Sequence, residues 1–158
     1  MFAKILVCLD GSGLAEQIVP YAMEAATHFG SKVVLLQVIS TVSSTIASSI
    51  PGVEPVPIPT EEIRREENEA EAYLERVARS LREKGLGVEC VTVLAAQPGE
   101  AIVRYANSSD VDLLAIATHG RSGLRRLVVG SVGGFVLRNS GLPMLVIRPK
   151  EGKTPPNR

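Results

Sequence analysis

The 158-residue sequence is poor in cysteine and has no excess charge of either sign. Its two cysteines, Cys8 and Cys90, are too few for a disulfide framework and lack the spacing of metal ligands. Seventeen basic and 17 acidic residues cancel, whereas a nucleic-acid-binding surface usually carries a net positive charge. We therefore expect buried, reduced thiols, as in a cytoplasmic protein, and no nucleic-acid partner.

Long hydrophobic runs are absent as well, which argues against a membrane protein. The apolar segment at the N-terminus is short and ends at Asp10, so we expect no signal peptide. The longest stretch without charge, residues 33–53, is interrupted by Ser, Thr and Gln and is too polar for a membrane span. With 45% hydrophobic and 22% charged residues, the chain has the composition of a soluble globular protein.

Short apolar runs rich in Val, Ile and Leu alternate with segments of helical pattern. We expect strands at residues 3–9, 33–39, 88–94, 112–117 and 144–148. We expect helices at residues 14–29, 61–84, 98–107 and 131–139. This alternation is typical of a parallel sheet with helices on both faces, so the sequence predicts an open, doubly wound α/β fold.

Two of these helices carry more detailed predictions. Pro20 predicts a kink in the first helix, because proline cannot donate a hydrogen bond to the carbonyl of Glu16. The charged face of the second helix predicts two i,i+4 ion pairs: Glu61 with Arg65 and Glu75 with Arg79.

Two segments break the alternation. Residues 41–60 are rich in Ser and Thr and then in Pro, and we expect an exposed variable loop there. Residues 150–158 are expected to be a disordered tail. The remaining chain, residues 1–149, is predicted to form a single domain.

Two loops have the composition of a ligand site. In a doubly wound sheet, ligands bind beyond the carboxyl ends of the strands, where the strand order reverses. The first loop, Leu9 to Gly13, follows the first strand, and the second begins at Ala117 after the fourth strand and continues to Gly130-Ser131. Glycine allows close backbone approach, and a helix that begins at Ser131 presents unpaired N–H groups to an anion. Together the two loops suit a phosphate chain.

Each element of this site also has a purely structural explanation. Gly120 ends a strand in that interpretation, and Ser131 caps the next helix. Two glycine turns at one crevice favour phosphate binding over these explanations. Asp10 is evenly balanced between capping the next helix and binding a ribose hydroxyl or nucleotide-bound magnesium. No Gly-x-Ser-x-Gly elbow is present, so no serine nucleophile is evident.

The spacing of the second loop resembles the ATP-binding branch of the universal stress protein family. That branch carries Gly-x2-Gly-x9-Gly-[Ser/Thr] after its fourth strand. The segment ATHGRSGLRRLVVGS supplies Gly120 and Gly130-Ser131, with Ala117 at the position of the first glycine. The segments KILVCLDGS, VVLLQVI and LPMLVIRP are also similar to the family. The resemblance implies an open five-stranded parallel sheet, Rossmann-like and similar to the adenine-nucleotide α-hydrolases, with strand order 3-2-1-4-5.

The resemblance also implies, position by position, which residues contact the nucleotide. Asp10, between Leu9 and Gly11, would lie by the ribose and by magnesium bound to the nucleotide. The backbone at Val38 would contact adenine. The following residues would surround the phosphates: Ala117, Gly120, Arg121, Gly130, Ser131 and Val132.

The function implied is that of a cytoplasmic, ATP-binding regulatory or sensor homodimer in the stress response, with an unidentified protein partner. The apolar strand Pro143–Pro149 lies at a sheet edge, where pairing with its copy would satisfy the open edge. No catalytic residue is expected, and any ATP hydrolysis or self-phosphorylation would be slow. The alternative is a dimeric interaction module that binds no nucleotide, which Ala117 in place of glycine favours. The sequence does not distinguish ATP from AMP or a cyclic nucleotide, and it gives no role to Gly133-Gly134.

Overall fold

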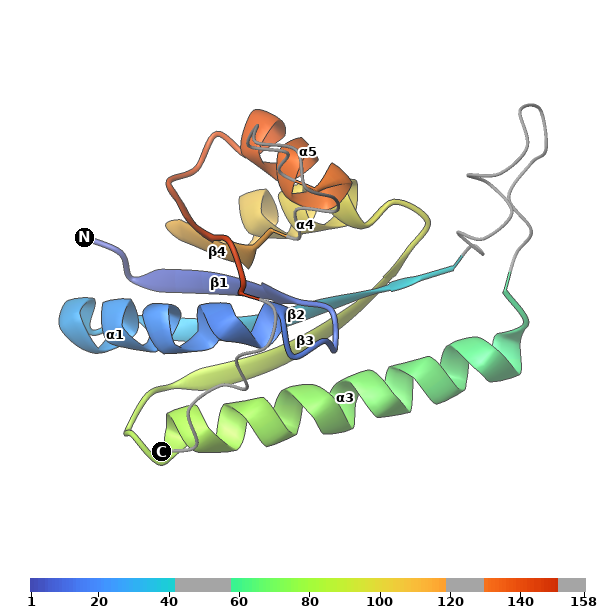
Figure 1. Cartoon of the computed structure of the whole chain (residues 1–158), viewed down its shortest axis with the longest axis horizontal. Helices are drawn as coiled ribbons and strands as arrows, with labels where there is room; N and C mark the ends of the chain where they lie inside the picture. The colour runs from blue at the N-terminus through green and yellow to red at the C-terminus, as the bar shows by residue number, and fades with distance from the viewer. Residues whose placement is uncertain (42–57, 119–129, 151–158) are drawn as a thin grey trace.

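The computed structural model describes residues 1–41, 58–118 and 130–150. Its five strands form one parallel sheet in the order β3-β2-β1-β4-β5, which confirms the expected fold and strand order (Figure 1). The strands are β1 Lys4–Leu9, β2 Lys32–Ser40, β3 Val88–Ala95, β4 Leu113–Ala117 and β5 Met144–Ile147.

Helices cover both faces of the sheet (Figure 1). They are the 3₁₀ turn η1 Ala15–Ile18 and the α-helices α1 Val19–Phe29, α3 Thr60–Arg82, α4 Pro98–Ser108 and α5 Ser131–Asn139. The helices α1 and α3 pack on one face, and α4 and α5 pack on the other. No helix in the described part of the chain is long and apolar enough to cross a membrane.

Residues 14–29 form two helical elements rather than the single kinked helix that we expected. The turn η1 ends at Ile18, and α1 begins at Val19 with Pro20 in its first turn. Proline is well tolerated there, because the N–H groups of the first turn have no partner within a helix. Gly30 ends α1 with φ 66°, a left-handed conformation that lacks the Cβ penalty in glycine.

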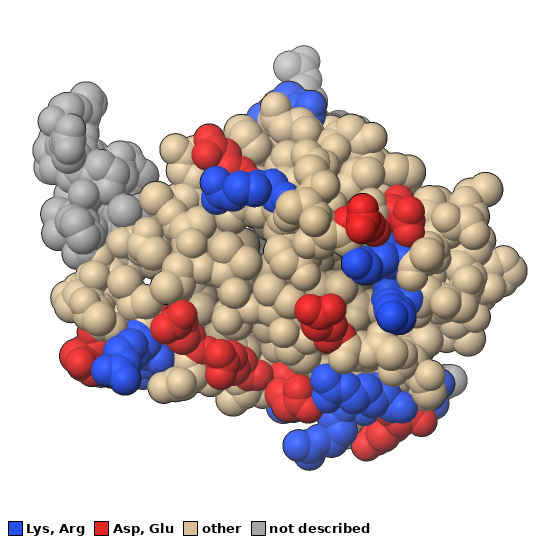
Figure 2. All heavy atoms as spheres, turned by 180° about the vertical axis from the view of Figure 1, so that it is seen from behind, with Lys and Arg blue, Asp and Glu red and all other residues tan. Residues whose placement is uncertain are grey.

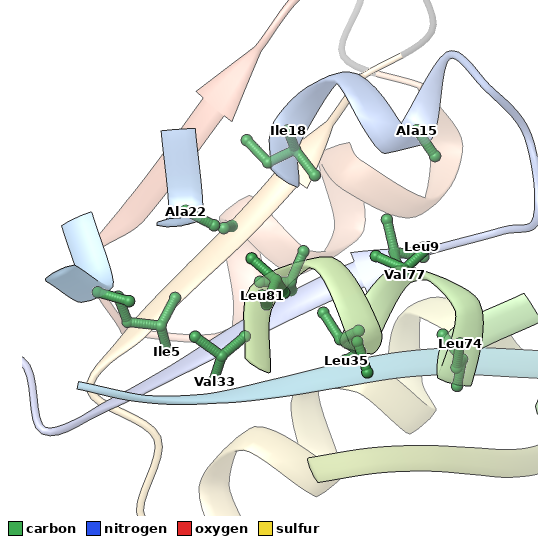
Figure 3. Packing of buried hydrophobic residues seen from close by; sticks show 14 of the residues in the cluster. Ile5, Leu9, Ala15, Ile18, Ala22, Val33, Leu35, Leu74, Val77 and Leu81 are labelled. Atoms are coloured by element: carbon green, nitrogen blue, oxygen red, sulfur yellow. The ribbon is translucent and has the colours of Figure 1, made fainter. Parts of the chain in front are cut away.

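The sheet separates two apolar cores. The core under α1 and α3 includes Ile5, Leu35 and Leu74, each fully buried (Figure 3). The core under α4 and α5 includes Leu6 and Val136. Neighbouring strand residues therefore point into opposite cores, as expected for strands covered on both faces.

The outer face of α3 carries acidic and basic side chains in mixture, visible along the lower edge of the molecule in Figure 2. The predicted i,i+4 pairs are wrong. Glu61 instead lies 3.8 Å from Arg64, and Glu75 contacts Arg82, which also donates to the Val88 carbonyl at 3.1 Å. Exposed long side chains exchange partners at little energetic cost, so helical spacing alone did not determine the pairs.

The chain that follows β5 is attached to η1 by the side chain of Gln17. The Gln17 amide donates from Nε2 to the Lys150 carbonyl at 2.9 Å and accepts from the Lys150 N–H at 2.9 Å. Residues 151–158 of the expected tail lie outside the described residues, as do residues 42–57 of the expected loop. The last residue of that loop, Thr60, begins α3.

Candidate functional site

A pocket of about 580 Å³ lies at the carboxyl ends of β1, β2 and β4, on the face that α4 and α5 cover. The central strand β1 has β2 on one side and β4 on the other, so the pocket occupies the point where the strand order reverses. Its lining residues are Cys8, Leu9, Asp10, Ala15, Leu36, Val38, Pro98, Ile102, Ile116, Ala117, Thr118, Gly130, Ser131, Val132 and Gly133.

The floor and one wall of the pocket are apolar. Cys8, Leu36 and Ile116 come from three adjacent strands, and Pro98 and Ile102 come from the first turns of α4. A surface of this kind suits the faces of an aromatic heterocycle. Burial raises the pKa of the Cys8 thiol to about 12, so Cys8 is a neutral wall residue at physiological pH.

The second cysteine is less buried than the sequence predicted. Cys90 lies on β3, is half-buried, and has its Sγ 3.7 Å from Oε2 of Glu75. Burial, and then the Glu75 carboxylate, raise the pKa of the Cys90 thiol. Its strand is at the edge of the sheet, which explains the exposure.

The loop after β1 is shaped by its own polar side chains. Asp10 Oδ1 accepts a hydrogen bond from the Ser12 N–H at 2.9 Å, and Ser12 Oγ accepts from the Ala15 N–H at 3.1 Å. Gly11 has φ 82°, in the left-handed region that favours glycine. Asp10 therefore caps its own loop rather than a helix. It is exposed and retains acceptor capacity for a ligand, because a carboxylate has two oxygens.

Beneath this loop, charged groups from α3 and η1 meet. Glu16 lies 3.6 Å from Arg76, whose guanidinium is 5.1 Å from the ring centre of Tyr73. Burial, followed by the carboxylates of Glu16 and Asp10, raises the pKa of Tyr73 well above its usual value, while Arg76 opposes the shift. Tyr73 is therefore a neutral phenol that packs beneath the loop.

The opposite side of the pocket is the N-terminus of α5. Gly130 is the N-cap residue, and the first helical hydrogen bond runs from Gly134 N–H to the Gly130 carbonyl at 2.7 Å. No side chain in the described residues caps this end. The amides of Ser131, Val132 and Gly133 thus have no partner within the helix and carry the positive end of its dipole.

The position of Ser131 in α5 shows that the sequence-based interpretation of this residue as a helix cap is wrong. Its hydroxyl was a candidate helix cap, but Ser131 is the first helical residue and does not cap α5. The side chain is exposed at the rim of the pocket. It is therefore available to a ligand that reaches the helix terminus.

The end of β2 presents backbone polar groups to the same pocket. Lys32 N–H donates toward β1, to the Ala3 carbonyl, and Val33 N–H donates toward β3, to the Gly87 carbonyl. Because this direction alternates along a parallel strand, the N–H and carbonyl of Val38 face the β1 side. The register of β1 with β2 ends where Leu9 meets Gln37, so Val38 lies one residue beyond it.

Most of the predicted site residues come together in this pocket. Those that line it are Leu9, Asp10, Val38, Ala117, Gly130, Ser131 and Val132. Gly11 is adjacent in the loop and shapes it. Gly120 and Arg121 lie outside the described residues.

Sequence reasoning missed eight lining residues: Cys8, Ala15, Leu36, Pro98, Ile102, Ile116, Thr118 and Gly133. The strand members could have been found from strand alternation, because Leu36 and Val38 share one face of β2. The contribution of α4 had no signal in the sequence, since it depends on how α4 packs beside α5.

A doubly wound α/β sheet with a pocket at its switch point is the architecture in which α/β domains bind their ligands. Residues 1–148 match the universal stress protein family, and the chain belongs to that family. It is 32% identical over 151 residues to the universal stress protein YxiE of Bacillus subtilis, covering 94% of this chain and 100% of that protein. It is 30% identical over 158 residues to the universal stress protein MJ0577 of Methanocaldococcus jannaschii, covering 95% and 97% of the two chains.

Solved structures agree with this assignment. The structure of MJ0577 is similar with a TM-score of 0.73 and 28% identity, covering 96% of this chain and 99% of that one. The structure of a universal stress protein in complex with cAMP is similar with a TM-score of 0.68 and 21% identity, covering 94% and 98%. At 21% identity, the similarity to the cAMP complex supports the fold alone.

Proposed function

We propose that this protein binds an adenine nucleotide in the switch-point pocket, ATP with magnesium above all, and acts as a nucleotide-dependent regulatory homodimer in the stress response. One observation carries the proposal. The uncapped N-terminus of α5 opens into a pocket whose floor and one wall are apolar. The cAMP held by a protein of the same fold supports an adenine nucleotide as the ligand.

The polarity of the pocket gives the nucleotide a direction. The phosphates lie against the amides of Ser131, Val132 and Gly133, where the helix dipole favours negative charge. The ribose lies by Asp10, whose carboxylate accepts from hydroxyl groups but repels phosphate. The adenine packs on the apolar wall and bonds to the backbone of Val38. The volume of about 580 Å³ is within the range of ordinary small-ligand pockets.

Magnesium fits this site as a partner of the nucleotide. Asp10 is the one carboxylate among the described residues that line the pocket, and these residues contain no cluster of three metal-ligating side chains. Magnesium usually binds through one or two carboxylates together with substrate phosphates. Asp10 would hold the ion, which would neutralise phosphate charge. Among the described residues that line the pocket, we find no general base other than Asp10, so we expect ATP turnover to be slow.

The homodimer part of the proposal rests on the open edge of β5. Leu114 N–H donates to the Pro143 carbonyl and Thr118 N–H to the Ile147 carbonyl. In β5, the backbone N–H and carbonyl groups of odd-numbered residues therefore face β4. Those of Val146 face the open edge of the sheet. The Val146 side chain is 40% exposed. Antiparallel pairing of this edge with its copy would form a two-fold interface.

Isothermal titration calorimetry of nucleotide-stripped protein tests the binding proposal. ATP with magnesium, ADP, AMP, cAMP and GTP are titrated into wild type, Gly130→Asp and Gly87→Asp. The aspartate at position 130 places negative charge where the phosphates would bind and should abolish binding. Gly87→Asp adds the same charge before β3, at the opposite end of the sheet, and should bind normally.

Absence of binding by folded wild-type protein would contradict the nucleotide proposal. It would favour a dimeric interaction module, for which Ala117 in place of the motif glycine is the supporting feature. The dimer is tested separately by light scattering of Val146→Pro, which removes the outward N–H and spares the bonds to β4. We expect Val146→Pro to be a monomer of about 16.8 kDa and Val146→Thr, which keeps the N–H, to be a dimer.

A further inference from the structure

The two helices that wall the pocket touch through one very close contact. Gly99 is buried in the first turn of α4, and a methyl group at this position would lie 2.9 Å from Cδ1 of Phe135 on α5. The same methyl group would lie 3.1 Å from Cβ and from Cγ of Phe135. Carbon atoms in normal contact lie about 3.5–4.0 Å apart. The helices therefore approach this closely only because residue 99 has no side chain.

Phe135 has no simple way to avoid a side chain at position 99. Rotation about its χ1 angle moves Cγ and Cδ1, but Cβ is fixed to the backbone of α5. A methyl group on residue 99 would therefore push the α5 backbone away from α4 by a few tenths of an ångström. The contact between Gly99 and Phe135 therefore sets the distance between the backbones of α4 and α5.

Both helices contribute to the pocket next to this contact. Pro98 and Ile102 of α4 line it on one side. The first turn of α5, from Ser131 to Gly133, lines it on the other, and Phe135 follows one helical turn after Ser131. A change in spacing at Gly99 and Phe135 is thus a change in the position of the free amides of α5 relative to the apolar wall.

We infer that Gly99 and Phe135 are positioning residues for the nucleotide site, because their contact fixes the distance between the α5 amides and the wall on α4. Neither residue lines the pocket, and neither is predicted to contact the ligand. The inference rests on the proposed function. It assigns part of the phosphate affinity to a glycine outside the motif.

The expected loss of ATP affinity can be estimated, because hydrogen bonds weaken sharply when donor and acceptor are displaced. In enzyme active sites, a misplacement of about 1 Å can cost on the order of 100-fold in rate. We take the hydrogen bonds from the α5 amides to phosphate to depend on position in a similar way. A shift of a few tenths of an ångström at the α5 amides should weaken ATP binding about tenfold. Adenosine lacks phosphates and does not reach those amides, so its affinity should change less than about twofold. This ratio separates positioning from a general loss of stability.

The inference is tested by calorimetric titration of ATP with magnesium, and separately of adenosine, into each variant. The temperature is kept well below the melting temperature of every variant. The variants are Gly99→Ala and Gly87→Ala, a matched control whose added methyl group would meet only Lys32 Cγ at 3.9 Å. We expect ATP affinity to fall about tenfold in Gly99→Ala and to stay at the wild-type value in Gly87→Ala. A Phe135→Ala background removes the contacts with Cδ1 and Cγ but keeps the contact with Cβ. In this background the Gly99→Ala change should therefore weaken ATP binding less, by about threefold.

Amide hydrogen exchange of the unliganded variants gives a readout that needs no nucleotide. We expect faster exchange at the hydrogen-bonded amides of α5, which begin at Gly134, in Gly99→Ala than in Gly87→Ala. Equal ATP affinity in wild type and Gly99→Ala, an equal loss for adenosine, or unchanged exchange would overturn the inference. Wild-type protein that binds no nucleotide would overturn the proposed function and this inference together, whereas normal wild-type binding with an unaffected Gly99→Ala would overturn the inference alone.

Discussion

The loop after β1 contains two glycines that differ in one respect, and this makes the cost of its conformation measurable. Gly11 has φ 82°, whereas Gly13 does not adopt a positive φ. A methyl group at Gly11 would meet only Gln37 Nε2, at 3.7 Å, and one at Gly13 would meet nothing within 4 Å. Neither substitution therefore creates a clash, and only the backbone conformation distinguishes them.

The expected difference in unfolding free energy follows from that contrast. A non-glycine residue in the left-handed region costs about 1–2 kcal/mol. Both alanines also restrict the unfolded chain, which stabilises the protein by about 0.4–1 kcal/mol in each case and cancels in the comparison. Gly11→Ala should thus be about 1–2 kcal/mol less stable than Gly13→Ala. Gly11→Asn should recover part of this loss, because asparagine tolerates the left-handed region.

Urea unfolding followed by circular dichroism measures these free energies from the midpoint and slope. The slope should be the same in all three variants, since the surface exposed on unfolding does not change. If Gly11→Ala and Gly13→Ala have equal stability within about 0.5 kcal/mol, the left-handed turn at Gly11 does not exist in solution. The shape assigned to the Asp10 loop would then be wrong.

Three further predictions concern the core, a buried thiol and the ligand site. Leu74→Ala should destabilise the protein by about 2–5 kcal/mol in urea unfolding, because the side chain is fully buried, and a smaller loss would contradict the packing of α3. Burial raises the pKa of the Cys8 thiol from 9.0 to about 12, so wild type should lose stability between pH 9 and pH 12, where the thiol ionises only in the unfolded chain. Between pH 9 and pH 10.5, the unfolding free energy of Cys8→Ala should therefore fall less than that of wild type. Equal decreases in the two proteins would refute this prediction. Asp10→Asn can still accept from Ser12 N–H and should unfold like wild type, yet bind ATP with magnesium about tenfold more weakly in calorimetry; unchanged affinity would remove Asp10 from the metal site.

Much of the fold could be predicted because local and global signals agree. Continuous apolar runs and alternating helices indicate a parallel sheet, and the helix at residues 131–139 was predicted with its observed bounds. The region around Pro20 could not be predicted in full. Proline disfavours a helix interior, but whether the chain kinks or begins a new helix depends on how η1 packs against β1 and β4.

The candidate site was predictable where it depends on the backbone and not where it depends on tertiary packing. The glycine turn at Gly11 and the start of α5 indicated the polar side of the pocket, because their conformations are local. The apolar wall on α4 was missed, since residues 98–102 read as an ordinary helix start. The closeness of α4 and α5 depends on Gly99 and Phe135, two residues 36 positions apart whose compatibility no local pattern reveals.

The attachment of Lys150 to Gln17 has a consequence for the tolerance of the two positions to mutation. Both hydrogen bonds use the side chain of Gln17 and only the backbone of Lys150. Any residue with an N–H group can therefore replace Lys150, and proline alone would remove a bond. At position 17 the donor and acceptor must both be kept on one side chain of the right length. In a library of random variants, position 17 should accept few residues and position 150 almost all, although the two residues form the same pair of bonds.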